Sequence, residues 1–220
     1  MKEDIKRGLI IVLIALAIFI VVFLVTSLRE KSITGYAGRY GYLNFTIMPS
    51  NITLQAVMLP EGWNFISFNV EPVDKSITSV LAPIEGKYSY LLEWDSENQE
   101  FRVWSEEGTK EFTKFNMNKS YFIFLKEDAI MNLSGSRFGN FNLTLLTGWE
   151  APNYPYEYNA SVSGNTFYNI NFSYMMIWDV ASQEFKIYSI YSSNPEFNKI
   201  SAGEGYFIHT EGGTLEYARA

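Results

Sequence analysis

The stretch Tyr90–Trp104 reads Tyr-Leu-Leu-Glu-Trp-Asp-Ser-Glu-Asn-Gln-Glu-Phe-Arg-Val-Trp, and it recurs 84 residues later as Tyr174–Tyr188, Tyr-Met-Met-Ile-Trp-Asp-Val-Ala-Ser-Gln-Glu-Phe-Lys-Ile-Tyr. Both copies place Trp-Asp before three variable residues, which are followed by Gln-Glu-Phe, a cation, a β-branched residue and an aromatic ring. Self-similarity at a fixed offset identifies the unit of folding before any element is assigned. In a chain of 220 residues it predicts two small domains of about 85 residues each.

Composition restricts the classes of protein to be considered. Aromatic residues make up 17% of the chain, so each domain is expected to have an aromatic-rich core. The absence of cysteine excludes disulfides, a thiolate metal site and a cysteine nucleophile. The net charge of −7 divides into +2 for residues 1–31 and −9 for the remainder. An acidic body is a poor partner for phosphate backbones, so we expect no nucleic-acid binding.

The N-terminal segment contains a long apolar run. Leu9–Leu28 are twenty residues without a charge, and only Thr26 and Ser27 are polar. As a helix that rises about 1.5 Å per residue, this run spans roughly 30 Å, the thickness of a bilayer's hydrocarbon core. A cleaved secretory signal has a shorter apolar region of about 7–15 residues. We therefore predict a transmembrane-type α-helix within residues 1–31, with the lipid bilayer as its partner.

Asn-x-Ser/Thr sequons indicate which side of the membrane the chain occupies. Charges on the two sides of the apolar run are too similar to decide this. All seven sequons follow the run, and N-glycosylation acceptors belong on an exported surface. A chance origin in an Asn- and Thr-rich β protein is the alternative. We predict a single-pass protein of the cell membrane with a cytoplasmic N-terminus and extracellular, glycosylated residues from about 32 onward. The sequon asparagines are Asn44, Asn51, Asn118, Asn132, Asn142, Asn159 and Asn171.

The remaining chain has the pattern of a β protein. Residues 32–41 contain three glycines and no hydrophobic period, which predicts a stalk linker. Alternating β-branched and aromatic residues at Tyr42–Ile47 and Ile52–Leu59 predict two strands joined by a turn, and Phe141–Leu146 is a cognate of the second. We predict a mainly β fold: one N-terminal α-helix, a first β domain at 42–136 and a second at 137–220, each an antiparallel sandwich or small barrel.

A Gly-Trp pair occurs in each copy, as Gly62-Trp63 and Gly148-Trp149. Residues after Trp63 alternate like a strand, whereas the corresponding residues 151–156, Ala-Pro-Asn-Tyr-Pro-Tyr, contain two prolines that a central strand cannot carry. Three tyrosines spaced by two would share one face of this rebuilt segment if it were extended. They predict an exposed aromatic contact site for a ligand or partner. These residues are Tyr154, Tyr156 and Tyr158.

The tryptophans allow two interpretations. Aromatic rings on sheets can stack on sugars, but their return at equivalent positions is also expected if each domain fills its core in the same way. We favour the core for each of them. The five are Trp63, Trp94, Trp104, Trp149 and Trp178.

Chemistry that would indicate an enzyme or a metal protein is sparse. Asp95 begins a predicted turn, where its carboxylate accepts backbone N–H bonds. A calcium loop is the alternative, but the glycine such loops need is missing and the second copy has Val180, Ala181 and Ser182 at the equivalent places. His209, the only histidine, is expected to be a half-exposed strand residue, and no Gly-x-Ser-x-Gly turn accompanies it. We expect no enzymatic activity, no metal and no other cofactor.

Two resemblances bear on function. Lys6-Arg7-Gly8 before the apolar run resembles the processing site of archaeal type IV pilin precursors, which implies cleavage after Gly8 and a helix that forms a filament core. Those pilins often carry a polar residue where this chain has Leu13, so we rank a filament subunit second. Residues 52–220 are similar to the tandem Gly-Trp-Asn and Trp-Asp modules of exported, often archaeal, cell-surface proteins.

The function expected from these observations is that of a membrane-anchored structural or adhesive module on the cell surface. Its partners would be other envelope proteins or glycans, and self-assembly is expected if the helix forms a filament. The alternatives are a pilin-like filament subunit and a carbohydrate-binding surface module.

Overall fold

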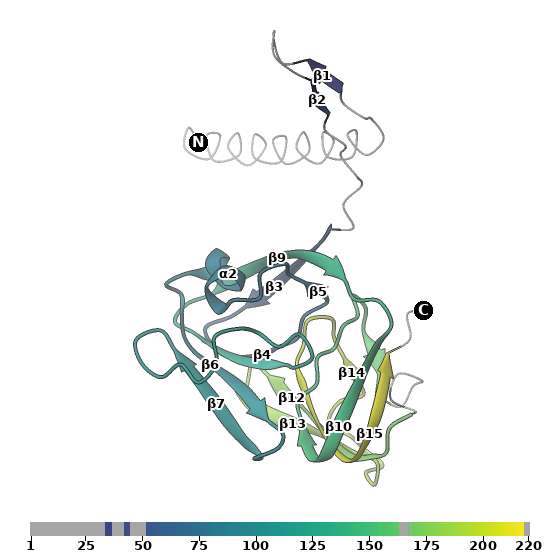
Figure 1. Ribbon diagram of the computed structural model, residues 1–220. Helices are drawn as coiled ribbons and strands as arrows, with labels where there is room; N and C mark the ends of the chain where they lie inside the picture. The colour runs from purple at the N-terminus through teal and green to yellow at the C-terminus, as the bar shows by residue number, and fades with distance from the viewer. Residues whose placement is uncertain (1–33, 37–41, 45–51, 163–166, 168, 218–220) are drawn as a thin grey trace, which may run out of the picture. The chain divides into compact units, whose positions relative to one another are not determined.

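The computed structural model describes residues 34–36, 42–44, 52–162, 167 and 169–217 (Figure 1). The chain divides into two compact units, residues 1–51 and 52–220. In the first unit, β1 (Thr34–Tyr36) pairs antiparallel with β2 (Tyr42–Asn44). β1 therefore lies within the stretch that was expected to be a structureless linker. Among the described residues, no helix is long and apolar enough to cross a membrane, and both Leu9–Leu28 and Gly8 lie outside them.

Residues 52–137, here called the first repeat, form two antiparallel sheets. Their strand orders are β3-β9-β5 and β4-β8-β6-β7. The elements are β3 (Ile52–Leu59), β4 (Gly62–Ile66), β5 (Val70–Glu71), α2 (Ile77–Val80), the 3-10 helix η3 (Ala82–Ile84), β6 (Tyr88–Asp95), β7 (Glu100–Ser105), β8 (Tyr121–Leu125) and β9 (Ala129–Arg137).

Residues 141–217, the second repeat, follow after only three residues. The four-stranded sheet has the order β10-β15-β12-β13, and a short sheet pairs β11 with β14. The strands are β10 (Phe141–Glu150), β11 (Ala160–Ser161), β12 (Phe172–Asp179), β13 (Glu184–Ser189), β14 (Lys199–Ile200) and β15 (Tyr206–Tyr217). β10 and β15 run side by side along their length (Figure 1). They are continuous where the first repeat has breaks, at Pro60-Glu61 and at residues 126–128.

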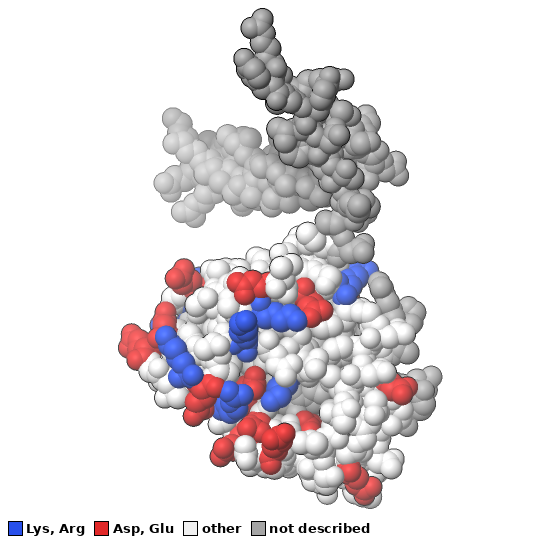
Figure 2. All heavy atoms as spheres, viewed as in Figure 1, with Lys and Arg blue, Asp and Glu red and all other residues white. Residues whose placement is uncertain are grey.

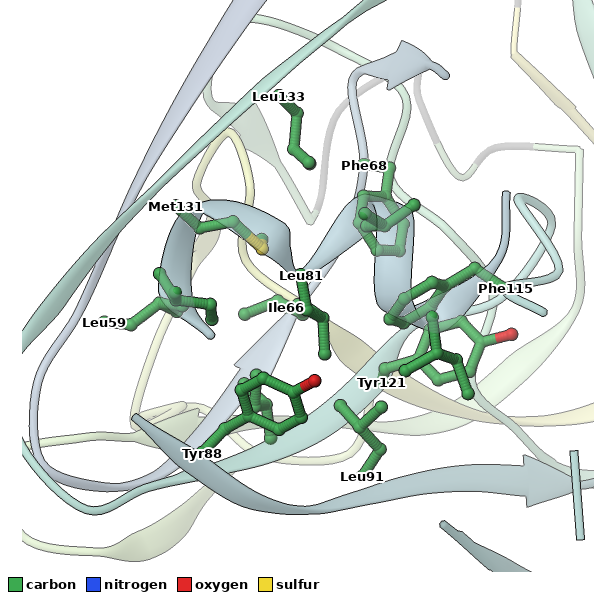
Figure 3. Packing of buried hydrophobic residues seen from close by; sticks show 14 of the residues in the cluster. Leu59, Ile66, Phe68, Leu81, Tyr88, Leu91, Phe115, Tyr121, Met131 and Leu133 are labelled. Atoms are coloured by element: carbon green, nitrogen blue, oxygen red, sulfur yellow. The ribbon is translucent and has the colours of Figure 1, made fainter. Parts of the chain in front are cut away.

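The core of the first repeat lies between its two sheets. Leu59, Met131 and Leu133 come from one sheet and Leu91 and Tyr121 from the other, and all are buried (Figure 3). Along β9, buried and exposed residues alternate as period-two patterning predicts. Figure 3 therefore shows a sandwich-like packing, and the prediction of a mainly β, antiparallel fold is confirmed.

Local signals in the first repeat are also confirmed. Ser76 caps α2, because its hydroxyl accepts a hydrogen bond from the backbone N–H of Ser79 at 3.4 Å. Asp95 Oδ1 accepts the N–H groups of Glu97 and Asn98 at 3.0 and 3.3 Å, as expected for turn chemistry. The Asn98 side-chain amide, at 3.0 Å, is the main reason why the pKa of Asp95 is lowered.

Both repeats belong to one compact unit, because a third apolar cluster joins their separate cores. It contains Phe65 and Phe122 of the first repeat and Ala151 and Phe207 of the second. Four of the five tryptophans pack half-buried against this cluster, whereas Trp104 is buried in the first core. The tryptophans thus lie in or against the interior, as favoured from the sequence. On the face shown in Figure 2, charges gather over the first repeat, with acidic and basic side chains side by side.

Candidate functional site at the junction of the two repeats

Trp63 of the first repeat is held through its backbone by the second repeat. β4 is an edge strand, so one side of it has no strand partner within its own sheet. The Trp63 N–H donates to Gln183 Oε1 at 2.9 Å, and the Trp63 carbonyl accepts from Gln183 Nε2 at 3.1 Å and from Trp178 Nε1 at 2.8 Å. The glutamine amide therefore occupies the place of a neighbouring peptide unit and covers an exposed strand edge.

The same contact is made in the opposite direction. The Trp149 N–H donates to Gln99 Oε1 at 3.0 Å, and its carbonyl accepts from Gln99 Nε2 at 3.1 Å and from Trp94 Nε1 at 2.8 Å. Each repeat thus supplies both halves of the contact, as the subunits of a two-fold symmetric dimer do. The duplicated Trp-Asp-x-x-x-Gln sequence and the Gly-Trp pair are the two sides of one interface.

Backbone strain marks the two glutamines. Gln99 and Gln183 both have φ 55°, and they are the two non-glycine residues with positive φ in the described chain. A left-handed conformation costs an L-residue about 1–2 kcal/mol, and glycine or asparagine normally occupies such a place. Their side chains account for the exception, since each glutamine amide makes two hydrogen bonds to the Trp backbone of the other repeat.

Glycine is required beside each clamp. Gly62 has φ 96° and Gly148 has φ 111°, and a Cβ would stand 2.9 Å from Gln183 Oε1 and 3.0 Å from Gln99 Oε1, respectively. Any side chain there would be strained and would also displace the glutamine amide. The glycine of the Gly-Trp pair is therefore explained by the contact between repeats.

Beyond the clamps, each edge strand pairs with a turn of the other repeat. Gly205 N–H donates to Phe65 O and Ser67 N–H to Gly203 O, both at 2.9 Å. In the reverse direction, Ser120 N–H donates to Ala151 O at 2.8 Å and Asn153 N–H to Asn118 O at 2.9 Å. The segment with two prolines therefore pairs across the junction and is not a strand of its own sheet.

An aromatic cluster fills the space between the clamps. Phe65 and Phe122 stack with ring centroids 4.2 Å apart and parallel planes, and Phe207 lies 5.0 Å from Phe65. Trp178 meets Phe122 edge-on at 5.5 Å, and Trp94 meets Phe207 in the same way at 5.5 Å. Edge-to-face and offset-stacked pairs are the favoured arrangements of aromatic rings.

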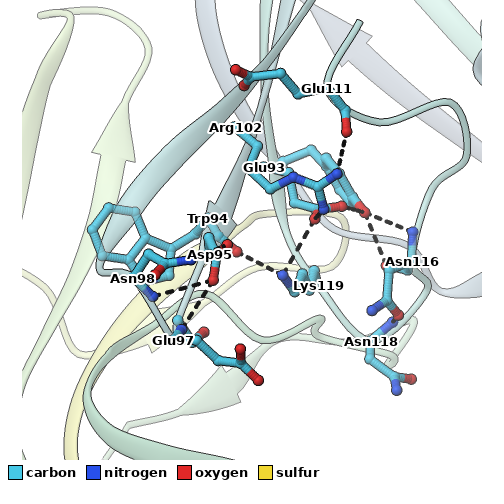
Figure 4. A network of polar contacts seen from close by, with 12 residues as sticks. Glu93, Trp94, Asp95, Glu97, Asn98, Arg102, Glu111, Asn116, Asn118 and Lys119 are labelled. Atoms are coloured by element: carbon cyan, nitrogen blue, oxygen red, sulfur yellow. Dashed lines mark hydrogen bonds and ion pairs between the residues drawn. The ribbon is translucent and has the colours of Figure 1, made fainter.

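A buried carboxylate, Glu93, lies on β6 next to Trp94, whose indole N–H is part of the clamp on Trp149. Its Oε1 pairs with Arg102 Nη1 at 3.1 Å and Lys119 Nζ at 3.3 Å (Figure 4), and its Oε2 accepts from Tyr121 Oη at 2.6 Å. Lys119 Nζ also donates to the Trp94 carbonyl at 2.7 Å. Burial and the adjacent carboxylate raise the pKa of Tyr121 well above its usual value. The sequence comparison missed this network because Ile177 stands at the position of Glu93 in the second copy.

A polar groove of about 590 Å³ opens beside this network. Asp95, Lys119 and Glu150 line it, together with two sequon asparagines, Asn118 and Asn142. Glu150 is buried, and its Oε1 accepts the Leu146 N–H at 2.6 Å. Glu93 and Glu150 are thus both engaged with protein partners, which favours a structural role for each.

Aromatic surfaces extend outward from the junction on each sheet. In the second repeat, the Trp149 ring lies 5.1 Å from His209, which lies 6.3 Å from Tyr174, and Tyr191 follows at 6.4 Å. Tyr174 and Tyr191 are 40% and 77% exposed, so these rings can contact a partner. His209 is half-buried on β15 with Nδ1 2.9 Å from Ser173 Oγ, and its prediction as a half-exposed strand residue is confirmed.

The prediction that three tyrosines form an exposed site is wrong for Tyr154. Tyr154 is completely buried, because the cross-junction pairing turns its ring into the second core, where its hydroxyl donates to the Tyr158 carbonyl at 2.8 Å. Tyr156 is half-buried and stacks on Tyr158 at 4.7 Å, and Tyr158 is 48% exposed. Burial raises the pKa of Tyr156 to about 12. The three rings are close together, but only the last two reach the surface.

Tyr156 and Tyr158 line a small hollow of about 230 Å³. Asn69 and Arg137 of the first repeat also line it, and Arg137 pairs with Glu157 at 2.8 Å. Asn69 Oδ1 is buried without a hydrogen-bond partner in the described structure. This hollow therefore combines stacked rings with polar groups from both repeats.

The sequon asparagines share one property wherever the structure describes their side chains: they are exposed. Asn44 and Asn51 lie outside the residues whose side chains are described. The exposed residues are Asn118, Asn132, Asn142, Asn159 and Asn171.

Comparison with known proteins identified no relative: no family model, no curated protein and no solved structure matches this chain.

Proposed function

We propose that this chain is a membrane-anchored, glycosylated structural or adhesive module of the cell surface. The exposure of every sequon asparagine whose side chain is described is the observation that supports it. The same chain also contains buried asparagines, Asn64 at 2% and Asn153 at 0% exposure, and neither is in a sequon. Acceptors for a bulky, solubilising glycan must be exposed, and here they are.

The junction supports the same proposal. An adhesive or envelope module must hold its contact surfaces in a fixed relation while partners bind. Two reciprocal glutamine clamps, two backbone pairings and a shared aromatic cluster join the repeats. The aromatic surface of Tyr174 and Tyr191 is the part of the second repeat best suited to contact an envelope protein.

The proposal is tested on protein taken from its native cell envelope. Intact mass, N-terminal sequence and glycopeptide masses are measured on the same sample. A chain that begins at Met1 and carries glycans supports a lipid-anchored surface module. A chain that begins at Leu9 indicates processing after Gly8 and directs attention to filaments. A chain with no glycan at any sequon overturns the glycosylated surface role.

Carbohydrate binding is a second candidate, which the hollow at Tyr156 and Tyr158 favours. Sugar sites combine an exposed ring face with a few hydrogen-bonding groups, and the exposed side chains of Arg137 and Glu157 supply such groups at this hollow. Saturable binding on a glycan array that Tyr158→Ala removes and Tyr191→Ala retains would support it. Binding that both variants retain, or no binding at all, would exclude this site.

A further inference from the structure

One face of the first repeat is apolar and exposed. In β3 every second residue points to solvent, and the four are Ile52, Leu54, Ala56 and Met58. Leu54 and Met58 are 78% and 79% exposed, and Ile130 of β9, opposite Met58, is 56% exposed. β3 is also an edge strand of its sheet. An exposed apolar edge strand is a template for pairing with another chain, and proteins normally protect such strands.

Asn132 lies in the middle of this face. Its cross-strand partner is Ala56, and it stands two residues from Ile130 and two from Ser134 on the same side of β9. Ser134 is the hydroxyl residue of the sequon Asn132-Leu133-Ser134. Both residues are exposed, and the small side chain of Ala56 leaves the space beside Asn132 open.

The corresponding face of the second repeat is mostly polar, with Leu146 of β10 as an exposed apolar residue. There Thr144 pairs with Thr214 and Asn142 pairs with Glu216. The pair Asn142 and Glu216 has the same register position as the pair Ala56 and Asn132 in the first repeat. Each lies one residue along its strands from a pair on the opposite side of the sheet, Leu143–Leu215 and Val57–Met131, respectively. Each repeat therefore has a sequon asparagine in the equivalent cross-strand pair, on β9 in the first repeat and on β10 in the second. The first sequon lies among several strongly exposed apolar side chains, whereas Leu146, at 43%, is less exposed than Leu54, Met58 and Ile130.

We propose that an N-linked glycan on Asn132 covers the apolar face formed by Leu54, Ala56, Met58 and Ile130. This inference rests on the proposed glycosylated surface role and adds a specific task for one site. A glycan here would keep β3 from pairing with a second chain, because it is bulky and hydrated.

The covalent step is a transfer from a lipid phosphate-linked sugar, catalysed by a transferase of the cell. The amide Nδ2 of Asn132 bonds to the anomeric carbon of the sugar. The bond between that carbon and the phosphate oxygen breaks, the lipid phosphate leaves with the electron pair, and Nδ2 loses one proton. No oxidant or reductant is needed.

The test compares full-length variants made in the native host and purified in detergent. Asn132→Gln and Ser134→Ala each remove the sequon, and Asn142→Gln is the matched control on the polar face. Glycopeptide masses, binding of a hydrophobic dye and the concentration dependence of self-association are measured for each. We expect a several-fold rise in dye binding and stronger association for the first two variants, with Asn142→Gln like the wild type.

Replacing the exposed apolar residues should reverse the effect. Leu54→Ser with Met58→Ser in the Asn132→Gln background is expected to return dye binding to the wild-type level. If glycopeptide masses show Asn132 without a glycan while other sequons are occupied, the inference is wrong and the proposed surface role still stands. The same holds if a second copy of the chain covers this face. Association equal in Asn132→Gln and Asn142→Gln also overturns the inference. If no sequon is occupied, the proposed function fails as well.

Discussion

The first repeat places Glu93 and Lys119 at the junction where the second places Ile177 and Glu204, and yet both repeats make the same clamp. In the first, an ion network neutralises the buried carboxylate. In the second, Glu204 stands at the position of the cation Lys119 and Ile177 at that of the carboxylate, so this ion pair is absent, and burial raises the pKa of Glu204. The comparison separates what the junction requires, namely the glycine, the tryptophans and the glutamine, from charges that can change if each is accommodated locally.

The largest effect is expected from the shared aromatic cluster. Phe122 and Phe207 occupy equivalent positions, and both are 4% exposed. Truncation of either to alanine should cost about 3–5 kcal/mol of unfolding free energy, because a buried ring is lost and a cavity remains. If the junction makes one cooperative unit, both variants shift the midpoint of a single unfolding transition of the full-length protein in detergent.

Val73→Ala is the control for this pair, since Val73 is fully exposed and its truncation should change the free energy of unfolding by less than about 0.5 kcal/mol. Two separate transitions, each moved by only one of the phenylalanine variants, would show that the repeats fold independently.

The next effect is expected at Glu93. Glu93→Gln leaves Lys119 and Arg102 without a carboxylate, and loss of one partner of a buried pair typically costs about 3–5 kcal/mol. The Arg102 and Lys119 side chains are 38% and 25% exposed, so water compensates in part and a loss of about 2–3 kcal/mol is expected. Urea unfolding without added salt measures this loss of unfolding free energy.

The matched control for Glu93 is the exposed pair of Glu106 and Lys126, where Glu106→Gln should cost no more than about 1 kcal/mol. Glu93→Ile introduces the residue that the second repeat has at this position, Ile177, and combining it with Lys119→Met removes the unpaired cation, so the double variant should recover most of the loss. If this double variant is no more stable than Glu93→Gln, the analogy between the two repeats is wrong.

The clamps are expected to differ in strength. Gln183→Ala removes two hydrogen bonds from Trp63 and should cost about 2 kcal/mol, whereas the more exposed Gln99 should lose about 1 kcal/mol on the same change. Gln183→Gly also removes the clamp but relieves the positive φ, so it should be about 1 kcal/mol less costly than Gln183→Ala. A Gln183→Gly protein more stable than the wild type would mean that the clamp contributes less than the roughly 1 kcal/mol gained by relieving the positive φ.

What the sequence could predict was local. The cap of α2 by Ser76, the Asp95 turn and the alternating strands follow from neighbouring residues, and the structure confirms them. Tyr154 shows the limit of such reasoning. Its spacing suggested an exposed face, but residues 151–153 pair with Asn118–Ser120 across the junction, which no local pattern encodes.

The sequence also contains two repeated features that belong to the junction. The glutamine recurs in both copies at a turn position where glycine or asparagine is usual, and the Gly-Trp pair also recurs. Residues that lie 120 apart in the chain had to be brought together before these two repeated motifs could be recognised as one contact. Membrane anchoring and processing at Gly8 remain predictions.

The smallest effect concerns pH and the second repeat alone. Burial raises the folded-state pKa of Glu204 above its ordinary value of 4.5. The folded state therefore favours the protonated acid, and the stability from this group is fully present below pH 4.5 and declines as the pH rises through the folded pKa. Glu204→Gln keeps an oxygen to accept the Ser201 N–H but cannot ionise. It should raise stability by less than about 1 kcal/mol at pH 7 and change little at pH 4.

Asp179 provides the opposite sign. The hydrogen bond from Lys186 lowers the pKa of Asp179, so its contribution to stability is present at neutral pH and is lost as the pH falls through the folded-state pKa. Urea unfolding of Glu204→Gln and Asp179→Asn at both pH values distinguishes the two, and a Glu204→Gln protein that is less stable than the wild type at pH 7 would refute the assignment of burial as the dominant cause.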